Sequence, residues 1–273
     1  MTITVHSAPA RFRRRGGKVA LRMTFIRSDA VVTALSVLSI IGAWYIGSWS
    51  LSERVLPAPH IVARVLFHAL QSGQIWSDIA ITLGRILIAF VIAMTVSAIL
   101  GFTMGLSHTA GVFFRVWVVC FITIPALVIM LTCYMVVGLN DKAAILGAAI
   151  PIIPILTINI REGVKGIDLQ LLGMAKAFRA SRHQQIFGVV APQIAPILLA
   201  SARFGLGLVW KMILFAELLG RGDGIGYRIE FYYQMFNMTE VLAHALSFLI
   251  VMLFIEVLIL GTIEKRIFRW RNH

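Results

Sequence analysis

Residues 80–105 read AITLGRILIAFVIAMTVSAILGFTMG, and this stretch decides the class of fold. Its only ionisable side chain is that of Arg85. At about 1.5 Å per residue, a helix of this length exceeds the roughly 30 Å thickness of the hydrocarbon layer of a bilayer. The stretch therefore predicts a transmembrane helix.

The rest of the chain has the same character. Of its 273 residues, 59% are hydrophobic and only 14% are charged, and the mean hydropathy is +0.88. So much apolar surface exceeds what a soluble core can bury, so we expect the surroundings to be lipid. We predict an all-α membrane protein with about six transmembrane helices, the other five at 31–49, 112–137, 143–160, 194–219 and 241–263.

Lysine and arginine are distributed unevenly between the two sides of the membrane. With an even number of spans, the tails 1–28 and 265–273 and the loop 161–193 share one side, and they hold most of the 25 basic residues. The positive-inside rule places that side in the cytoplasm. We therefore expect cytoplasmic N- and C-termini around one transmembrane domain at 29–264. The net charge of +13 follows from this bias and from attraction to lipid headgroups, without a nucleic-acid partner.

Most of the 161–193 loop and the start of the fifth span form the segment Asp168–Pro196. It reads DLQLLGMAKAFRASRHQQIFGVVAPQIAP. Asp168 is suited to capping a first short helix, and Ser181 with Gln184 forms the capping-box pattern of a second. Prolines then mark the start of the fifth span. Periodicity alone leaves two interpretations open, an interfacial anchor and a helix pair held by a partner. The apolar positions with helical spacing are Leu171, Leu172, Ala175, Phe178, Ile186, Phe187 and Val190.

Five ionisable residues fall within predicted spans, where each requires a partner or a function. Arg203 and Glu256 lie at one depth, roughly 10 Å from the cytoplasmic side, and Arg85 and Glu217 lie together near the outer side. We predict two interhelical pairs, Arg203 with Glu256 and Arg85 with Glu217. Lys211 has no counterpart at its depth, and it either lines a water-filled pathway for anions or reaches backbone carbonyls or headgroups.

Several short patterns in their order along residues 55–270 resemble permease subunits of binding-protein-dependent ATP-binding-cassette importers, in the branch for nitrate, sulfonates, taurine or bicarbonate. The coupling-loop signature of that family is matched in its later part. The matching stretches are Leu56-Pro57-Ala58-Pro59, Thr82-Leu83-Gly84-Arg85, Gly173-Met174-Ala175-Lys176, Ala180-Ser181-Arg182, Val189-Val190-Ala191-Pro192, Ala216-Glu217-Leu218 and Gly224-Ile225-Gly226-Tyr227.

Two signature positions depart from the family pattern. Gly173 stands where the family has glutamate, and Arg179 stands where it has glycine. Glycine takes a positive φ freely, whereas arginine in that conformation costs on the order of 1 kcal/mol or forces a different turn. We still expect the loop to dock, because the helical pattern, the caps and the prolines are intact.

The resemblance implies a type I importer permease fold and a multi-pass protein of the bacterial inner membrane, which is not an enzyme and holds no cofactor. The sequence lacks a G-x-x-x-x-G-K-[ST] motif, so ATP and Mg²⁺ belong to a separate ATPase. The implied partners are two ATPase subunits, a second permease copy in a homodimer, an extracytoplasmic binding protein and lipid. The implied ATPase-coupling residues are Asp168, Leu172, Ala175, Lys176, Phe178, Arg179, Ala180, Ser181, Arg182 and Phe187.

Two other classes of protein compete with this interpretation. A secondary transporter or channel would work without an ATPase, but such transporters usually contain an inverted repeat, and no matching half is visible at this length. A membrane-embedded enzyme would need convergent catalytic groups within a span, whereas each carboxylate here has a basic partner at its own depth. The sequence does not name the substrate; a small anion is the class that Lys211 favours.

Overall fold

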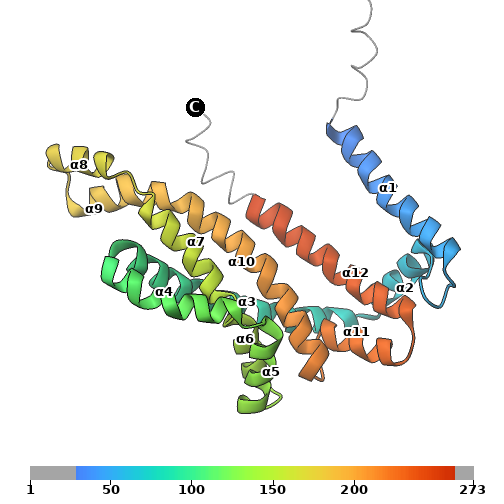
Figure 1. Cartoon of the computed structure of the whole chain (residues 1–273). Coiled ribbons are helices and arrows are strands. Elements are labelled where there is room, and N and C mark those ends of the chain that lie inside the picture. Colours follow the sequence, from blue (N-terminus) through green and yellow to red (C-terminus); the bar gives the residue numbers. More distant parts are fainter. Residues whose placement is uncertain (1–28, 262–273) are drawn as a thin grey trace, which may run out of the picture.

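The computed structural model describes residues 29–261, and these residues form helices without a single strand (Figure 1). The tails at 1–28 and 265–273 and the end of the predicted 241–263 span lie outside the described residues. The helices are α1 Asp29–Ser50, α2 Pro59–Ser72, α3 Gln74–Leu106, α4 His108–Thr123, α5 Ala126–Val137, α6 Asp141–Ala149, α7 Ile153–Lys165, α8 Leu169–Ala177, α9 Arg182–Gln185, η1 Ile186–Val190, α10 Ala191–Gly220, α11 Ile225–Gln234, α12 Met238–Phe254 and η2 Ile255–Leu260.

Within this range, four helices are long and apolar enough to cross a membrane, and the number rises to six if each of two bent helix pairs is one span. The prediction of about six spans is confirmed when each bent pair is counted as one span. The four straight helices cover Val31–Ser50, Ile75–Leu106, Arg182–Gly220 and Met238–Val257.

The predicted span at 112–137 is a bent pair of helices rather than one straight helix. The chain bends by 92° between α4 and α5, at Ile124 and Pro125. Ile124 is extended, with φ −77° and ψ 126°, because the ring of a proline disfavours the helical region for the residue before it. A milder bend of 40° separates α6 from α7, where Pro151 and Pro154 follow each other closely.

Small residues bring α3 and α7 into close contact. A Cβ atom on Gly101 would lie 2.8 Å from the Cβ atom of Ile160, and one on Gly105 would lie 2.7 Å from that of Val164. Both distances are shorter than any real carbon contact, so only glycine permits this approach. Close packing through small residues is a common means of helix association in lipid, where the hydrophobic effect between helices is absent.

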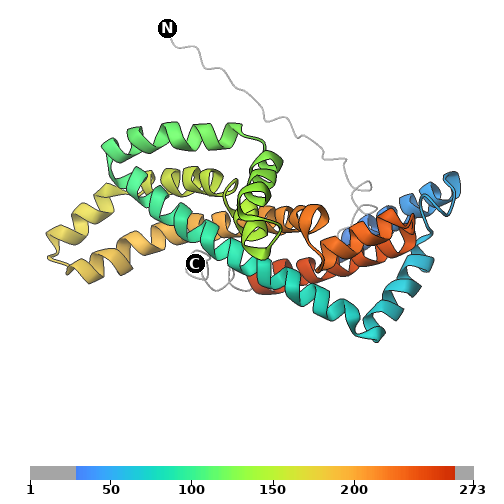
Figure 2. The same cartoon turned by 90° about the horizontal axis from the view of Figure 1, so that it is seen from below.

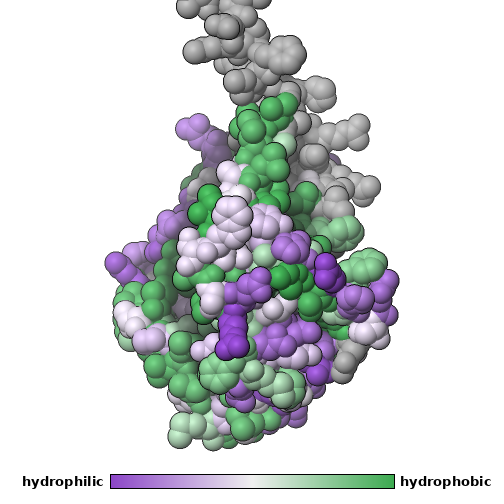
Figure 3. Space-filling model, turned by 90° about the vertical axis from the view of Figure 1, so that its right-hand side faces the viewer, coloured by the Kyte–Doolittle hydropathy of each residue, from purple (hydrophilic) through white to green (hydrophobic). Residues whose placement is uncertain are grey.

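The two ends of the molecule differ in character. In Figures 1 and 2, α8 and α9 extend from one end, while α1 and α2 lie at the other. Almost none of α1 is buried, and its apolar side chains face outward, as expected for a helix surrounded by lipid. Figure 3 views the α1 and α2 end directly, where hydrophilic residues gather below the hydrophobic surface of α1.

Candidate functional site

Helix α8 begins at the cap that the sequence predicts. The Asp168 carboxylate accepts hydrogen bonds from the backbone N–H groups of Gln170 at 2.7 Å and Leu171 at 3.3 Å. The backbone N–H of Asp168 donates to the side-chain carbonyl of Gln193, at 2.7 Å. The start of α8 is therefore both capped and tied to the first turn of α10.

Helix α8 ends in a left-handed turn centred on Arg179, which has a φ of 55°. The backbone N–H of Arg179 donates to the carbonyl of Lys176, and that of Ala180 donates to the carbonyl of Ala175, as in a Schellman motif. Arg179 thus adopts a left-handed conformation that glycine takes more readily, at a conformational cost on the order of 1 kcal/mol.

The second predicted cap is present too. Ser181 Oγ accepts from the backbone N–H of Gln184 at 3.3 Å, and the Gln184 side chain accepts from that of Ser181 at 2.8 Å. The helix that follows is not a separate short element, however. It continues through the π-helical segment η1 into α10, so that Arg182–Gly220 forms one helix of 39 residues.

The π-helical segment explains why prolines failed to separate the two helices. The backbone N–H of Ala191 donates to the carbonyl of Ile186, a spacing of five residues. In the next position Pro192 lacks an N–H, which a first-turn or irregular position tolerates better than a regular helix interior does. The wider turn therefore lets the helix pass Pro192 without ending.

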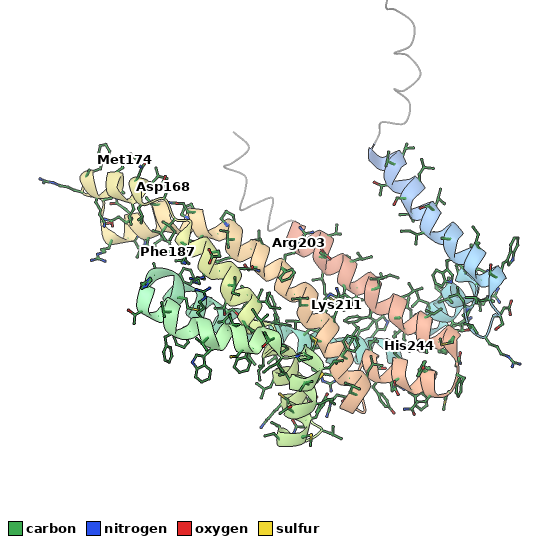
Figure 4. The ribbon with its side chains drawn as sticks, in the orientation of Figure 1. Asp168, Met174, Phe187, Arg203, Lys211 and His244 are labelled. Carbon is green, nitrogen blue, oxygen red and sulfur yellow. The ribbon has the colours of Figure 1, made fainter. Side chains whose placement is uncertain are left out.

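The pair α8–α9 presents apolar side chains to the exterior. Phe178 is 80% exposed and Phe187 is 64% exposed, and Leu169, Met174 and Ile186 are also exposed. Among the other predicted coupling residues, Leu172, Ala175 and Ala180 are half-buried, while Lys176, Arg179, Ser181 and Arg182 are exposed. Figure 4 shows Asp168, Met174 and Phe187 together at this end of the molecule.

A groove of about 510 Å³ follows one face of α10. Its lining residues from α10 recur every three or four positions, which is the spacing of a single helix face. Arg203 and Lys211 belong to this face, and Glu256 completes the groove from η2 (Figure 4). The remaining lining residues are Pro196, Leu199, Ala200, Phe204, Gly207 and Leu208.

Lys211 is exposed in this groove. Its Nζ atom lies 5.6 Å from the centre of the Trp210 ring, a cation–π distance. An ammonium group in an open groove is available to an anion.

Arg203 and Glu256 meet, with Arg203 Nη2 3.3 Å from Glu256 Oε1. The two residues come from α10 and η2, as the predicted interhelical pair requires, and their side chains are 44% and 52% exposed in the single chain. The reason is that both residues line the open groove rather than a closed contact between α10 and α12. An exposed pair of this kind contributes only about 0–1 kcal/mol to stability.

Arg85 and Glu217 belong to a larger charge cluster. Arg85 Nη1 lies 2.7 Å from Glu217 Oε1, and these side chains are 4% and 0% exposed. Arg85 also contacts Asp141 at 2.7 Å and Asp223 at 2.5 Å, and Arg221 contacts both of these carboxylates. Our sequence analysis missed Asp141, which begins α6, and Arg221 and Asp223, which lie in the loop between α10 and α11, because their positions depend on the folding of distant helices.

Backbone groups complete the surroundings of Glu217. Its Oε2 accepts from the backbone N–H of Gly226 at 2.9 Å, and Thr82 Oγ1 lies at the same distance. Gly224, with a φ of 95°, and Gly226 leave the space that the carboxylate fills, since a Cβ atom on either would overlap Glu217. In the adjoining loop, partial burial raises the pKa of Asp223, but Arg85 and Arg221 outweigh it and hold that pKa below its ordinary value.

An all-helical membrane subunit with a lined groove and a projecting helix pair has the architecture of a transport permease. The chain belongs to the family described as binding-protein-dependent transport system inner membrane component, whose sequence profile matches residues 93–269. It is a multi-pass inner-membrane permease of an ATP-binding-cassette importer, and acts as a translocation subunit rather than an enzyme.

Three relatives agree with the family assignment. A putative aliphatic sulfonates transport permease of Bacillus subtilis is 26% identical over 235 residues, which are 85% of each chain. The taurine transport system permease of Escherichia coli is 24% identical over 84% of this chain and 85% of its own. A nitrate import permease of Synechococcus elongatus is 27% identical over 63% of this chain and 61% of its own.

Proposed function

We propose that this permease imports a small anion and is driven by a separate ATPase that holds α8 and α9. The observation that carries the coupling proposal is the exposed apolar surface of this helix pair, which includes Phe178 and Phe187. Both helices are capped at their N-terminal ends, which stabilises the helix pair without a partner. An apolar surface surrounded by basic residues suits docking in a groove of another protein.

The groove along α10 supports an anionic substrate. It contains two cationic side chains, Arg203 and Lys211, against one carboxylate, Glu256. Nitrate, bicarbonate, an organic acid and the sulfonate group of an alkanesulfonate or of taurine all carry the negative charge that these cations attract. Two copies of the chain would place two such grooves around a common pathway, with two ATPase subunits inside and a binding protein outside.

The proposed sidedness is supported by the placement of the elements. The start of α1, the end of α12 and the pair α8–α9 all lie toward the upper side of Figure 1. A cytoplasmic position of α8–α9 would therefore put both termini in the cytoplasm as well, as the distribution of basic residues predicts.

Site-directed crosslinking tests the coupling. In a background with Cys120→Ser and Cys133→Ala, the exposed Ala177→Cys variant should crosslink to the co-purified ATPase, with a yield that changes on adding ATP. Gln71→Cys, equally exposed on α2 at the other end of the molecule, is the control and should not crosslink. Free labelling of Ala177→Cys under every nucleotide condition would favour a secondary transporter instead.

A further inference from the structure

A cavity of about 410 Å³ lies at the end of the molecule away from α8 and α9. Four helices, α2, α3, α11 and α12, enclose it, and it shares no residue with the groove along α10. Figure 4 shows His244 of this cavity far from Met174, with Lys211 between them. Its polar lining side chains include His68, Asp78, Arg228, Tyr232, Glu240 and His244.

One wall of the cavity carries a cation with unused hydrogen-bond donors. Arg228 Nε donates to Asp78 Oδ2 at 2.7 Å, and Asp78 is only 5% exposed. Within residues 29–261, this is the one hydrogen bond that the Arg228 side chain makes. Because Asp78 is neutralised by this contact, the terminal guanidinium nitrogens remain as N–H donors for a ligand.

Helix α12 offers acceptors to the same cavity. His244 is 6% exposed, and its Nδ1 lies 2.9 Å from the backbone carbonyl of Glu240. A carbonyl only accepts, so Nδ1 carries the proton and Nε2 of the neutral ring is a lone-pair acceptor. In the described part of the chain no group donates to Nε2, and the Glu240 carboxylate has no contact other than His244 at 3.6 Å.

These donors and acceptors together define the chemistry of a ligand. A simple anion would meet Arg228 but be repelled by Glu240, and a simple cation would leave the guanidinium donors unused. A molecule that carries both an ammonium group and an oxyanion satisfies both the donors and the acceptors. We propose that this cavity binds such a small zwitterion, with its oxyanion on Arg228 and its ammonium group on Glu240 and His244.

This site is separate from the proposed anion pathway and does not rest on it. Two sources supply the same chemistry, a free solute and the ethanolamine phosphate headgroup of a lipid. The cavity lies at the end that the distribution of basic residues assigns to the outer side. Figure 3 shows hydrophilic residues gathered over this end of the molecule.

Calorimetric titration of the full-length permease tests the proposal, in nanodiscs of phosphatidylglycerol. The probes are the zwitterions β-alanine and taurine, with propionate, ethanesulfonate and ethylamine as single-charge analogues. Each zwitterion should bind about tenfold or more tightly than its analogues, since a charged hydrogen bond is lost in each of these. Equal binding of propionate and β-alanine would overturn the proposal.

The lipid content of the nanodiscs distinguishes the two sources. If a headgroup is the occupant, phosphatidylethanolamine should compete with β-alanine and weaken its binding. Unchanged binding would assign the site to a free solute. Both results agree with a ligand that carries an ammonium group and an oxyanion. Failure of the zwitterions to bind in nanodiscs of phosphatidylglycerol alone would contradict the proposal.

Variants locate the site. Glu240→Gln should weaken zwitterion binding about tenfold. Because Arg228→Gln alone would strand buried Asp78, the double variant Asp78→Asn with Arg228→Gln keeps that contact neutral and should also lose binding. Lys142→Met is the control, because Lys142 is exposed at the start of α6 and lines neither the cavity nor the α10 groove, and it should bind both zwitterions normally. Loss of binding in Lys142→Met, or normal binding in Glu240→Gln, would refute the assignment.

Discussion

Lys211 is the residue on which the proposed anion pathway depends. Its ammonium group lies exposed in the groove, so replacing it with methionine removes a charge without opening a core cavity. Lys211→Met should therefore reduce uptake of an anion such as nitrate or ethanesulfonate about tenfold or more, and Lys211→Arg should have a milder effect. The measurement is uptake into proteoliposomes that contain the assembled importer.

Lys142→Met is the matched control, because Lys142 is also exposed but lies at the start of α6, outside the groove. It should transport normally. Wild-type uptake by Lys211→Met over a range of substrate concentrations would assign Lys211 to packing against Trp210.

At the scale of one element, α8 carries a strained C-terminal end and a glycine in its interior. Arg179→Gly should relieve the left-handed conformation and stabilise α8 by about 1 kcal/mol. Amide hydrogen exchange over residues 169–180 should slow about fivefold as a result. Gly173→Glu should add to this protection, since a Cβ atom there meets nothing within 4 Å and glycine is a poor helix former.

Two variants control this prediction. Phe236→Gly should give a similar local gain at the end of α11, because Phe236 has a φ of 56° in the same type of turn. Lys176→Gly, inside α8, should speed exchange instead. Faster exchange in Arg179→Gly would show that the arginine side chain stabilises the turn by more than its backbone costs.

At the scale of the whole molecule, the Arg85 cluster joins α3 to α10 and to the loops before α6 and α11. Arg85→Met would leave the buried Glu217 without a cation, whereas Asp141 and Asp223 keep Arg221, and the loss should be about 3–5 kcal/mol. This loss of stability is measured by thermal unfolding in detergent, with size-exclusion chromatography as the readout of folded protein.

Arg203→Met is the matched comparison, because the Arg203–Glu256 pair is half-exposed and should lose no more than about 1 kcal/mol. Equal tolerance of Arg85→Met and Arg203→Met would mean that the cluster contributes little to the fold. The sequence predicted one carboxylate partner for each arginine. The difference in expected stability loss therefore follows from the difference in burial between the two pairs.

The sequence by itself determined the features that depend on neighbouring residues. Hydropathy predicted the helices that cross the membrane, and the caps at Asp168 and Ser181 were visible in local patterns of three or four residues. The charges at matched depths in the spans predicted which side chains would meet, because depth along a helix follows from residue number alone. The short motifs also identified the family.

Tertiary structure decided the features that depend on distant segments. The 92° bend at Pro125 and the passage of a single helix through Pro192 are alternatives that local sequence leaves open, and packing selects between them. The wider Arg85 cluster and the cavity beside His244 need helices far apart in the chain to meet. Such contacts carry no local pattern, since their energy arises only after the helices have packed.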